Sequence, residues 1–213
     1  MSRVGAAEPR AKKKSLHASQ RDTPRVKRKR RAFKKKVAER DVSRFKFLDE
    51  SSVNSSLTRL YGRAAPGERV VDSTPQPSGL QTTTLAVIGL EGITAPLVLP
   101  GSVKGTVFYG YLQQCVIPTL APGDILFMDN LTAHKVAGIK ALIRAHGADL
   151  IYLPPYSPDL NPIELAWSKI KTILRRFKAR TFSDLIEALK QALLAITPQD
   201  IQGWFAHCGY AIN

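Results

Sequence analysis

Cysteine is scarce in this sequence, which has only Cys115 and Cys208 among its 213 residues. Two cysteines outside a short secreted chain do not indicate a disulfide framework, and no C-x-x-C pair suggests a zinc site. A glycine-rich phosphate-binding loop and a Ser-His-Asp arrangement are also missing. Any chemistry in this protein must therefore come from other side chains.

Long hydrophobic runs are missing as well. The best candidate, residues 85–100, is interrupted by Glu91 and by several glycines and prolines. No segment therefore reaches the roughly 18 apolar residues of a membrane span. The N-terminus also lacks the apolar core of a signal peptide. The sequence predicts a protein without a membrane span, in a reducing, cytoplasmic setting.

Acidic residues are few at the N-terminal end, where basic residues are many. Residues 1–46 contain 18 Lys and Arg but 4 Asp and Glu, whereas residues 47–213 contain 14 and 13. Such a basic segment is typical of a nucleic-acid-binding arm, and a solvated tail is a compatible reading. We predict a basic, largely disordered leader or linker at 1–43, with a helix at 24–40, followed by a globular domain at 44–213.

Hydrophobic periodicity in the globular part predicts alternating strands and helices. The predicted order is a strand at 44–48, a hairpin of 82–89 and 93–99, a helix at 106–120, a strand at 125–128, a helix at 135–146, a strand at 150–153, a helix from Pro162, a helix at 181–196 and a short helix from Pro198. This order favours an α/β fold, a mixed sheet with helices on both faces.

Three acids occupy distinctive positions in these elements. Asp49 and Asp129 each follow an apolar strand, and open α/β sheets bind ligands at the carboxyl ends of their strands. Glu164 is the third residue of a helix that has Asn161 as its N-cap and Pro162 as its first residue. Two other roles remain open: Glu164 would complete a capping box with Asn161, and Asp129 would cap the helix near His134.

Three carboxylates of this kind suit hard cations. Magnesium takes oxygen ligands, and two ions together promote phosphodiester cleavage. Basic residues are candidates for contacts with nucleic-acid phosphates or are simply solvated; they are Lys171, Arg175 and Lys178, in line with Glu164, and Arg28, Arg30 and Arg31 in the leader. Four further acids are interpreted as turn, cap or solvent residues: Glu50, Asp124, Asp149 and Asp159.

Four motifs carry a resemblance to a known family. They are FLDES (47–51), LYGRAAPGERV (60–70), PGDILFMDNLTAHK (122–135) and YLPPYSPDLNPIELAWSKIK (152–171). Together they resemble the catalytic half of the mariner-like DDE transposases, particularly the bacterial insertion-sequence branch. The 34 residues between Asp129 and Glu164 are typical of that branch.

The resemblance implies an RNase H-like fold with Asp49, Asp129 and Glu164 as the metal-binding catalytic triad. It also implies Mg²⁺ or Mn²⁺ as cofactor, DNA strand cleavage and strand transfer, and a homodimer acting on transposon ends and target DNA at the nucleoid. Such transposases usually begin with helix-turn-helix modules. We therefore expect this chain to be the catalytic part of a longer protein, a second reading frame or a truncated copy, with those modules encoded upstream.

Two other functions are weighed against this one. An inactive transposase remnant would keep the fold and only bind DNA non-specifically, but all three acids are present. A structure-specific or RNA–DNA hybrid nuclease would share the metal site, but it would not explain the SPDLNPIELAW segment.

Overall fold

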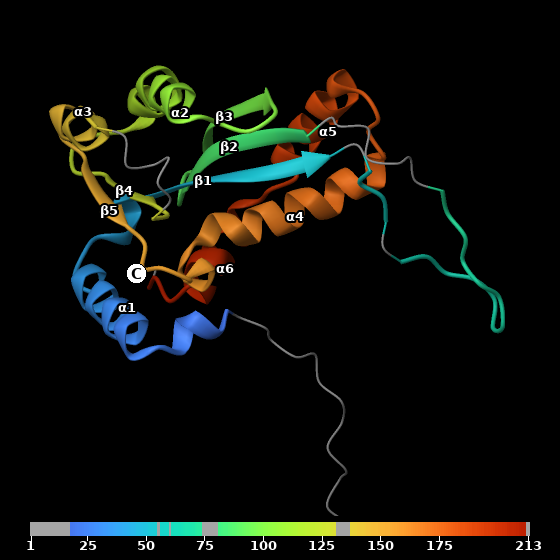
Figure 1. Ribbon diagram of the computed structural model, residues 1–213, viewed down its shortest axis with the longest axis horizontal. Coiled ribbons are helices and arrows are strands. Elements are labelled where there is room, and N and C mark those ends of the chain that lie inside the picture. Colours follow the sequence, from blue (N-terminus) through green and yellow to red (C-terminus); the bar gives the residue numbers. More distant parts are fainter. Residues whose placement is uncertain (1–17, 55, 60, 74–80, 131–136, 212–213) are drawn as a thin grey trace, which may run out of the picture.

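Five strands form a single mixed sheet in the computed structural model, which describes residues 18–54, 56–59, 61–73, 81–130 and 137–211. The strand order is β3-β2-β1-β4-β5 (Figure 1). The strands are β1 (Phe45–Asn54), β2 (Gln81–Gly89), β3 (Gly92–Pro100), β4 (Ile125–Met128) and β5 (Asp149–Tyr152). β1, β2 and β3 pair antiparallel, while β4 pairs parallel with both β1 and β5. The predicted mixed sheet and its hairpin are confirmed.

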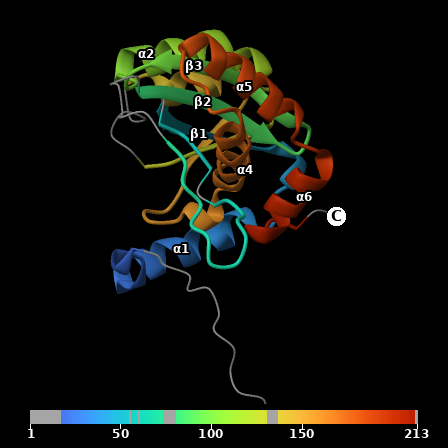
Figure 2. The same cartoon turned by 90° about the vertical axis from the view of Figure 1, so that its right-hand side faces the viewer.

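Helices cover both faces of this sheet, as predicted. They are α1 (Pro24–Val37), α2 (Gly105–Tyr111), α3 (Ile139–Ala145), α4 (Pro162–Phe177), α5 (Phe182–Leu194) and α6 (Pro198–His207). Figures 1 and 2 show α2 and α3 on one side of the sheet, and α4, α6 and α1 on the other. Along the described stretches, no helix is both long and apolar enough to cross a membrane.

Two predicted helices differ in extent from the helices of the structure. The helix predicted at 106–120 ends at Tyr111 and continues as a π turn, Leu112–Val116, and a 3₁₀ turn, Ile117–Thr119. Pro118 explains this change, because proline cannot donate the backbone hydrogen bond of a continuing helix. The helix predicted at 135–146 begins at Ile139, and His134 lies outside the described residues.

Strand alternation divides the core into two halves. Phe45 and Phe47 of β1 and Phe127 of β4 point to the side of α4, whereas Leu48 and Leu126 point to the side of α2. The Phe45 and Phe127 rings lie 4.9 Å apart, and Phe47 stacks on Phe127 at 4.6 Å. This aromatic cluster fixes β1 and β4 side by side, and both strands lead to the candidate site.

β1 is longer than the sequence predicts, and this corrects the position of Asp49. The strand was predicted to end before Asp49, but it continues to Asn54, so Asp49 lies inside it. The reason is the pairing partner: β2 pairs with β1 as far as Asn54, whereas β4 pairs only with 45–47. Asp49 therefore lies just beyond the point where β4 stops pairing with β1.

Helix α1 is present within the predicted range 24–40 and packs onto the sheet. Val26, Phe33 and Val37 are buried, whereas Ala32, which the sequence placed in the same apolar stripe, is exposed. The Phe33 ring lies 5.9 Å from the Phe127 ring in an edge-to-face arrangement. This part of the basic leader therefore shares the main hydrophobic core with the sheet.

The edge strand β3 contains a bulge opposite Ala86. Leu97 pairs with Leu85 and Thr94 pairs with Val87, so Ala95 and Pro96 together stand opposite a single residue of β2. Ala95 has a φ of 50°, and its carbonyl accepts a hydrogen bond of 2.7 Å from the Tyr111 hydroxyl. Helix α2 thus holds the bulge in place.

Candidate metal centre

The three predicted acids line one pocket beside the point where β4 stops pairing with β1. Asp49 comes from β1, Asp129 follows β4 directly, and Glu164 lies in the first turn of α4. The pocket has a volume of about 520 Å³, and its other wall is the 153–161 segment that leads into α4. Residues separated by more than 100 positions in the sequence are therefore brought to the same cavity.

Asp49 is the most enclosed of the three acids, with only 7% of its surface exposed. Its Oδ1 atom accepts a hydrogen bond of 2.8 Å from the Glu50 backbone N–H. Its Oδ2 atom accepts one of 3.0 Å from the side-chain Nδ2 of Asn161. A buried carboxylate needs such donors, since burying a charge without partners is costly. The carboxylate is thus held in one orientation.

Asn161 has a role that the sequence did not reveal. It precedes Pro162 as the predicted N-cap, but its side chain makes no capping hydrogen bond to α4. Its amide nitrogen binds Asp49 instead, and its Oδ1 atom is buried without a hydrogen-bond partner. An ionised carboxylate only accepts, so the nitrogen must face Asp49. The capping box with Glu164 is therefore not formed.

Glu164 is exposed as a residue, but its carboxyl group lies partly within the pocket. Partial burial is the main influence that raises the pKa of Glu164, the Lys171 ammonium group opposes the rise, and the charge of Asp129 adds to it. A raised pKa indicates a carboxylate that a bound cation would stabilise. The helix start that the sequence predicts near His134 lies outside the described residues, and α3 begins after Gly138 without a side-chain cap.

The donor set of the pocket fits a hard cation, although it is not assembled as a tight ligand cluster. Within the described residues, no group of three or more His, Cys, Asp or Glu side chains is placed to hold a metal ion. The pocket does offer three carboxylates and the unpartnered, buried Oδ1 of Asn161. Oxygen donors of this kind suit Mg²⁺ and Mn²⁺, and the described lining of the pocket contains no Cys or His.

The basic residues predicted to contact nucleic acid occupy different surroundings. Lys171 and Arg175 are half-buried on α4, and the Nε atom of Arg175 is buried without a hydrogen-bond partner. Lys178 forms an ion pair of 2.7 Å with Asp72. In the leader, Arg28 and Arg31 are exposed.

Arg30, the third basic candidate of the leader, binds Asp159 at 2.6 Å, and only 11% of its side chain is exposed. It is turned toward the loop before α4 and away from solvent, unlike Arg28 and Arg31.

The four acids interpreted as turn, cap or solvent residues all lie outside the lining of the pocket. Asp124 is buried at the start of β4, where its Oδ2 accepts a hydrogen bond from the Ala121 N–H. Asp149 lies 3.7 Å from Arg40. Asp159 differs from the interpretation: it binds two arginines of the leader and is not simply solvated.

A mixed sheet of this order, flanked by helices on both faces and with three carboxylates in one pocket, agrees with the RNase H-like architecture predicted from the sequence. Residues 44–187 match the model of the DDE superfamily endonuclease family. The chain belongs to this family. Among curated proteins, none is similar enough in sequence to match the chain.

Solved structures support the same fold. The "Mos1 transposase paired-end complex with left transposon end" matches 96% of this chain and 64% of its own, with 15% identity and a TM-score of 0.71. The "Mos1 Strand Transfer Complex" matches 99% of this chain and 68% of its own, with 14% identity and a TM-score of 0.70. The "catalytic domain of Mos1 mariner transposase" matches 93% and 98%, with 14% identity and a TM-score of 0.58. The RNase H-like fold is confirmed, and the chain spans about two thirds of the longer Mos1 chains.

Proposed function

We propose that this chain is a transposase catalytic domain that cleaves DNA strands and transfers them during transposition, as in the bacterial insertion sequences that it resembles. The observation that carries the proposal is the meeting of Asp49, Asp129 and Glu164 in one pocket of a DDE-family fold. Phosphoryl transfer needs little from a protein beyond positioning and charge, and this pocket supplies both.

The three acids are proposed as the catalytic metal ligands. Asp49 is fixed by β1 and by Asn161, so it sets the position of the centre. Asp129 follows the end of β4, and Glu164 lies in the first turn of α4. The two are close enough for the charge of Asp129 to raise the pKa of Glu164. A pair of bound Mg²⁺ or Mn²⁺ ions would activate a water or 3′-hydroxyl nucleophile and stabilise the leaving oxygen.

DNA, both transposon ends and target, is the proposed partner. The Mos1 structures with the same fold include complexes with transposon DNA. In this chain, the exposed Arg28 and Arg31 of α1 and the half-buried Lys171 and Arg175 of α4 are proposed to contact phosphates. Arg30 and Lys178 are already neutralised by Asp159 and Asp72, which confines the proposal to the other four residues.

The remaining parts of the proposal concern assembly. A homodimer, a cytoplasmic site of action at the nucleoid and helix-turn-helix modules encoded upstream follow from the resemblance to mariner-like transposases. An inactive remnant is disfavoured because the three acids and the donor to Asp49 are retained together.

Neighbouring acids on β1 provide a sharp test of this function. Asp49 and Glu50 are adjacent in the strand, so their side chains point to opposite faces. We expect Asp49→Asn, Asp129→Asn and Glu164→Gln each to abolish Mg²⁺- or Mn²⁺-dependent nicking of plasmid DNA, whereas Glu50→Gln retains most of it. Wild-type nicking by Asp129→Asn in Mg²⁺ would refute the assignment. Free Mn²⁺, followed by its EPR signal, provides a second readout of the same centre.

A further inference from the structure

We propose that Asp159 is a positioning residue for the candidate metal centre, through which helix α1 holds the loop that carries Asn161 and leads to Glu164. The inference rests on the proposed function and deepens it. It assigns part of the basic leader to the assembly of the site, in addition to any contact with DNA.

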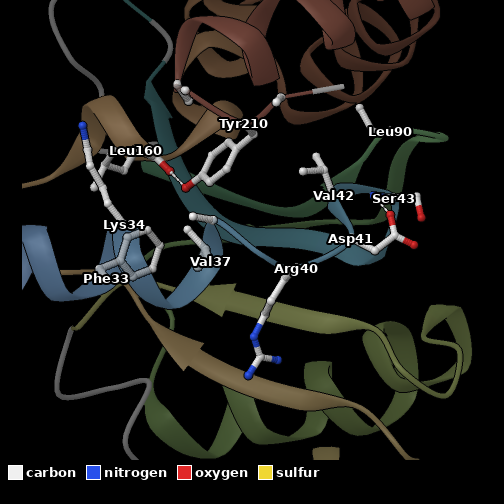
Figure 3. A pocket seen from close by; sticks show the side chains of 14 residues that line it. Phe33, Lys34, Val37, Arg40, Asp41, Val42, Ser43, Leu90, Leu160 and Tyr210 are labelled. Carbon is white, nitrogen blue, oxygen red and sulfur yellow. Dashed lines mark hydrogen bonds between the residues drawn. The ribbon is translucent and has the colours of Figure 1, made fainter. Parts of the chain in front are cut away.

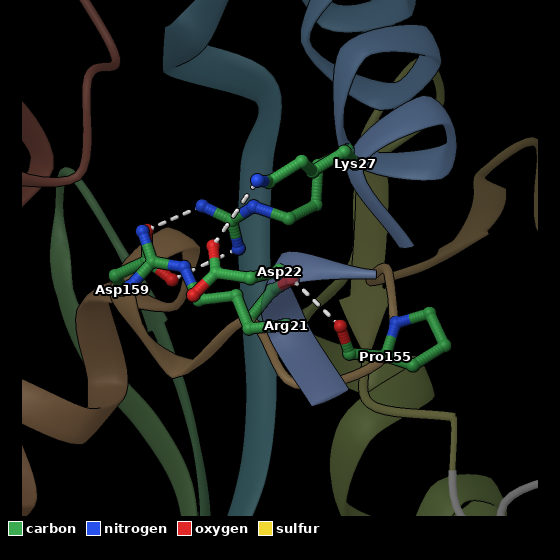
Figure 4. A network of polar contacts seen from close by, with 7 residues as sticks. Arg21, Asp22, Lys27, Pro155 and Asp159 are labelled. Atoms are coloured by element: carbon green, nitrogen blue, oxygen red, sulfur yellow. Dashed lines mark hydrogen bonds and ion pairs between the residues drawn. The ribbon is translucent and has the colours of Figure 1, made fainter. Parts of the chain in front are cut away.

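The leader contacts Asp159 through two arginines. Arg30 donates from Nη1 to Asp159 Oδ1 at 2.9 Å and from Nη2 to Oδ2 at 2.6 Å, a bidentate pair. Arg21 donates to the same Oδ2 at 3.3 Å, as Figure 4 shows. Bidentate, charge-assisted pairs are stronger and more specific in geometry than single contacts. Two arginines of the leader thus converge on one carboxylate of the loop.

The Arg30–Asp159 pair is largely shielded from solvent on the arginine side. Only 11% of the Arg30 side chain is exposed, while Asp159 and Arg21 are about a third exposed. Burial alone would raise the pKa of Asp159, but the hydrogen bonds and charge of Arg30, with the charge of Arg21, outweigh it and lower that pKa. The carboxylate is therefore ionised at neutral pH, and the pair persists there.

Asp159 is connected to the proposed metal ligands through Asn161. Asp159 lies in a 3₁₀ turn, Pro158–Leu160, directly before Asn161. The Asn161 N–H donates to the Pro158 carbonyl at 3.0 Å, so the turn and Asn161 form one unit. Asn161 then donates to Asp49 and begins the helix that carries Glu164. A shift of the turn would move both the donor to Asp49 and the start of α4.

The turn is also held from its other side. The Tyr210 hydroxyl donates to the Leu160 carbonyl at 2.6 Å, and Figure 3 shows this bond beside Phe33 and Val37 of α1. Leu160 is buried in the same core as those two side chains. The 158–161 turn is therefore fixed by apolar packing and Tyr210 at Leu160, and by α1 at Asp159.

Other ion pairs of the described leader residues lack these features. Lys27 and Asp22 are both largely exposed and 3.7 Å apart, and Arg40 meets Asp149 through a single contact of 3.7 Å. Exposed pairs of this kind contribute little to stability. Asp149 belongs to β5 and does not line the pocket, so the Arg40–Asp149 pair is a matched control for Arg30–Asp159.

The experiment measures Mn²⁺ binding to the full chain from the EPR signal of the free ion, without DNA. Groups that orient metal ligands typically change metal affinity by about 10–100-fold when they are removed. We expect Asp159→Asn to weaken Mn²⁺ binding by at least about tenfold, and Asp149→Asn to leave it unchanged. Asp159→Glu, which keeps the carboxylate, should recover most of the loss. A purely structural role would lower the melting temperature without this change in affinity.

Two further variants make every outcome decisive. Asp129→Asn removes a proposed ligand directly: if it leaves Mn²⁺ binding intact, the proposed centre and this inference both fail. If Asp129→Asn weakens binding but Asp159→Asn does not, only the positioning role is overturned. Should Asp159→Asn not fold, Arg30→Lys keeps the positive charge but removes the guanidinium group that makes the bidentate pair. Wild-type Mn²⁺ affinity in that variant would equally overturn the positioning role of Asp159.

Discussion

Glu164 makes the stability of the metal-free protein depend on pH. Its pKa is raised from 4.5, so the folded state binds more protons than the unfolded state as pH rises through that range. The contribution of Glu164 to the free energy of unfolding is then favourable in acid, and it is lost as pH rises through the folded-state pKa. At neutral pH the ionised Glu164 destabilises the fold, and a bound cation would reverse this effect.

Replacing the Glu164 carboxylate by an amide tests whether its charge destabilises the metal-free fold. In EDTA, Glu164→Gln should melt at a higher temperature than the wild type at neutral pH, and the difference should disappear near about pH 4, below the ordinary glutamate value. Added Mn²⁺ should raise the melting temperature of the wild type more than that of the variant. Glu187→Gln, an exposed glutamate of α5, controls for the loss of one charge. Equal melting temperatures at all pH values would contradict the raised pKa of Glu164.

Single residues also show where sequence reasoning stops. Asp129 and Glu164 lie at the predicted ends of their elements, because an apolar run and a Pro-initiated helix are local signals. The position of Asp49 inside β1 depends on how far the partner strand β2 continues its pairing, and this is not encoded near Asp49. Asn161 has a side chain that suits an N-cap equally well, so only the folded geometry assigns it to Asp49.

Among the elements, helix α1 is held to the domain by contacts with residues far along the chain. Its apolar side is narrow, and the ring that contacts Phe33 belongs to Phe127, far along the chain. The composition of the segment, rich in lysine and arginine, predicts a nucleic-acid-binding arm, with a solvated tail as a compatible reading. The sequence therefore identifies the helix but not its docking, because docking depends on contacts that no local pattern contains.

Truncating Phe33 tests whether α1 is integral to the domain. Phe33 is 6% exposed, and removing such a side chain typically costs about 3–5 kcal/mol of unfolding free energy. We expect Phe33→Ala to lower the urea midpoint of the whole domain in a single transition. Ala32→Ser, at the exposed neighbouring position, should change the unfolding free energy by less than about 0.5 kcal/mol. A domain that unfolds as before in Phe33→Ala would show that α1 is only loosely attached.

For the whole molecule, the position of the positive charge matters more than its total of +15. Among the described residues up to 46, several cations form ion pairs with acids: Arg21, Lys27, Arg30, Arg40, Arg44 and Lys46. Others, including Arg28 and Arg31, extend from α1 into solvent. Arg28 and Arg31 can therefore replace counterions on DNA without first breaking one of these ion pairs, whereas the paired cations cannot.

Two double variants with the same loss of charge separate these groups. Each neutralised phosphate contributes about 0.9 to the slope of log affinity against log salt, so Arg28→Gln with Arg31→Gln should reduce the slope by about 1.8. Arg21→Gln with Arg30→Gln should leave the slope nearly unchanged. Filter binding of a random duplex over a salt series measures both. Equal reductions would mean that net charge alone determines DNA affinity.

The bulge in β3 has a consequence for self-association. Open sheet edges invite strand addition by other chains, and proteins often protect them with bulges and proline. Ala95 turns the backbone out of the ladder, and the exposed Pro96 has no N–H to offer to an incoming strand. At the opposite edge, β5 has only four residues. Growth of the sheet into aggregates through β3 or β5 is therefore disfavoured.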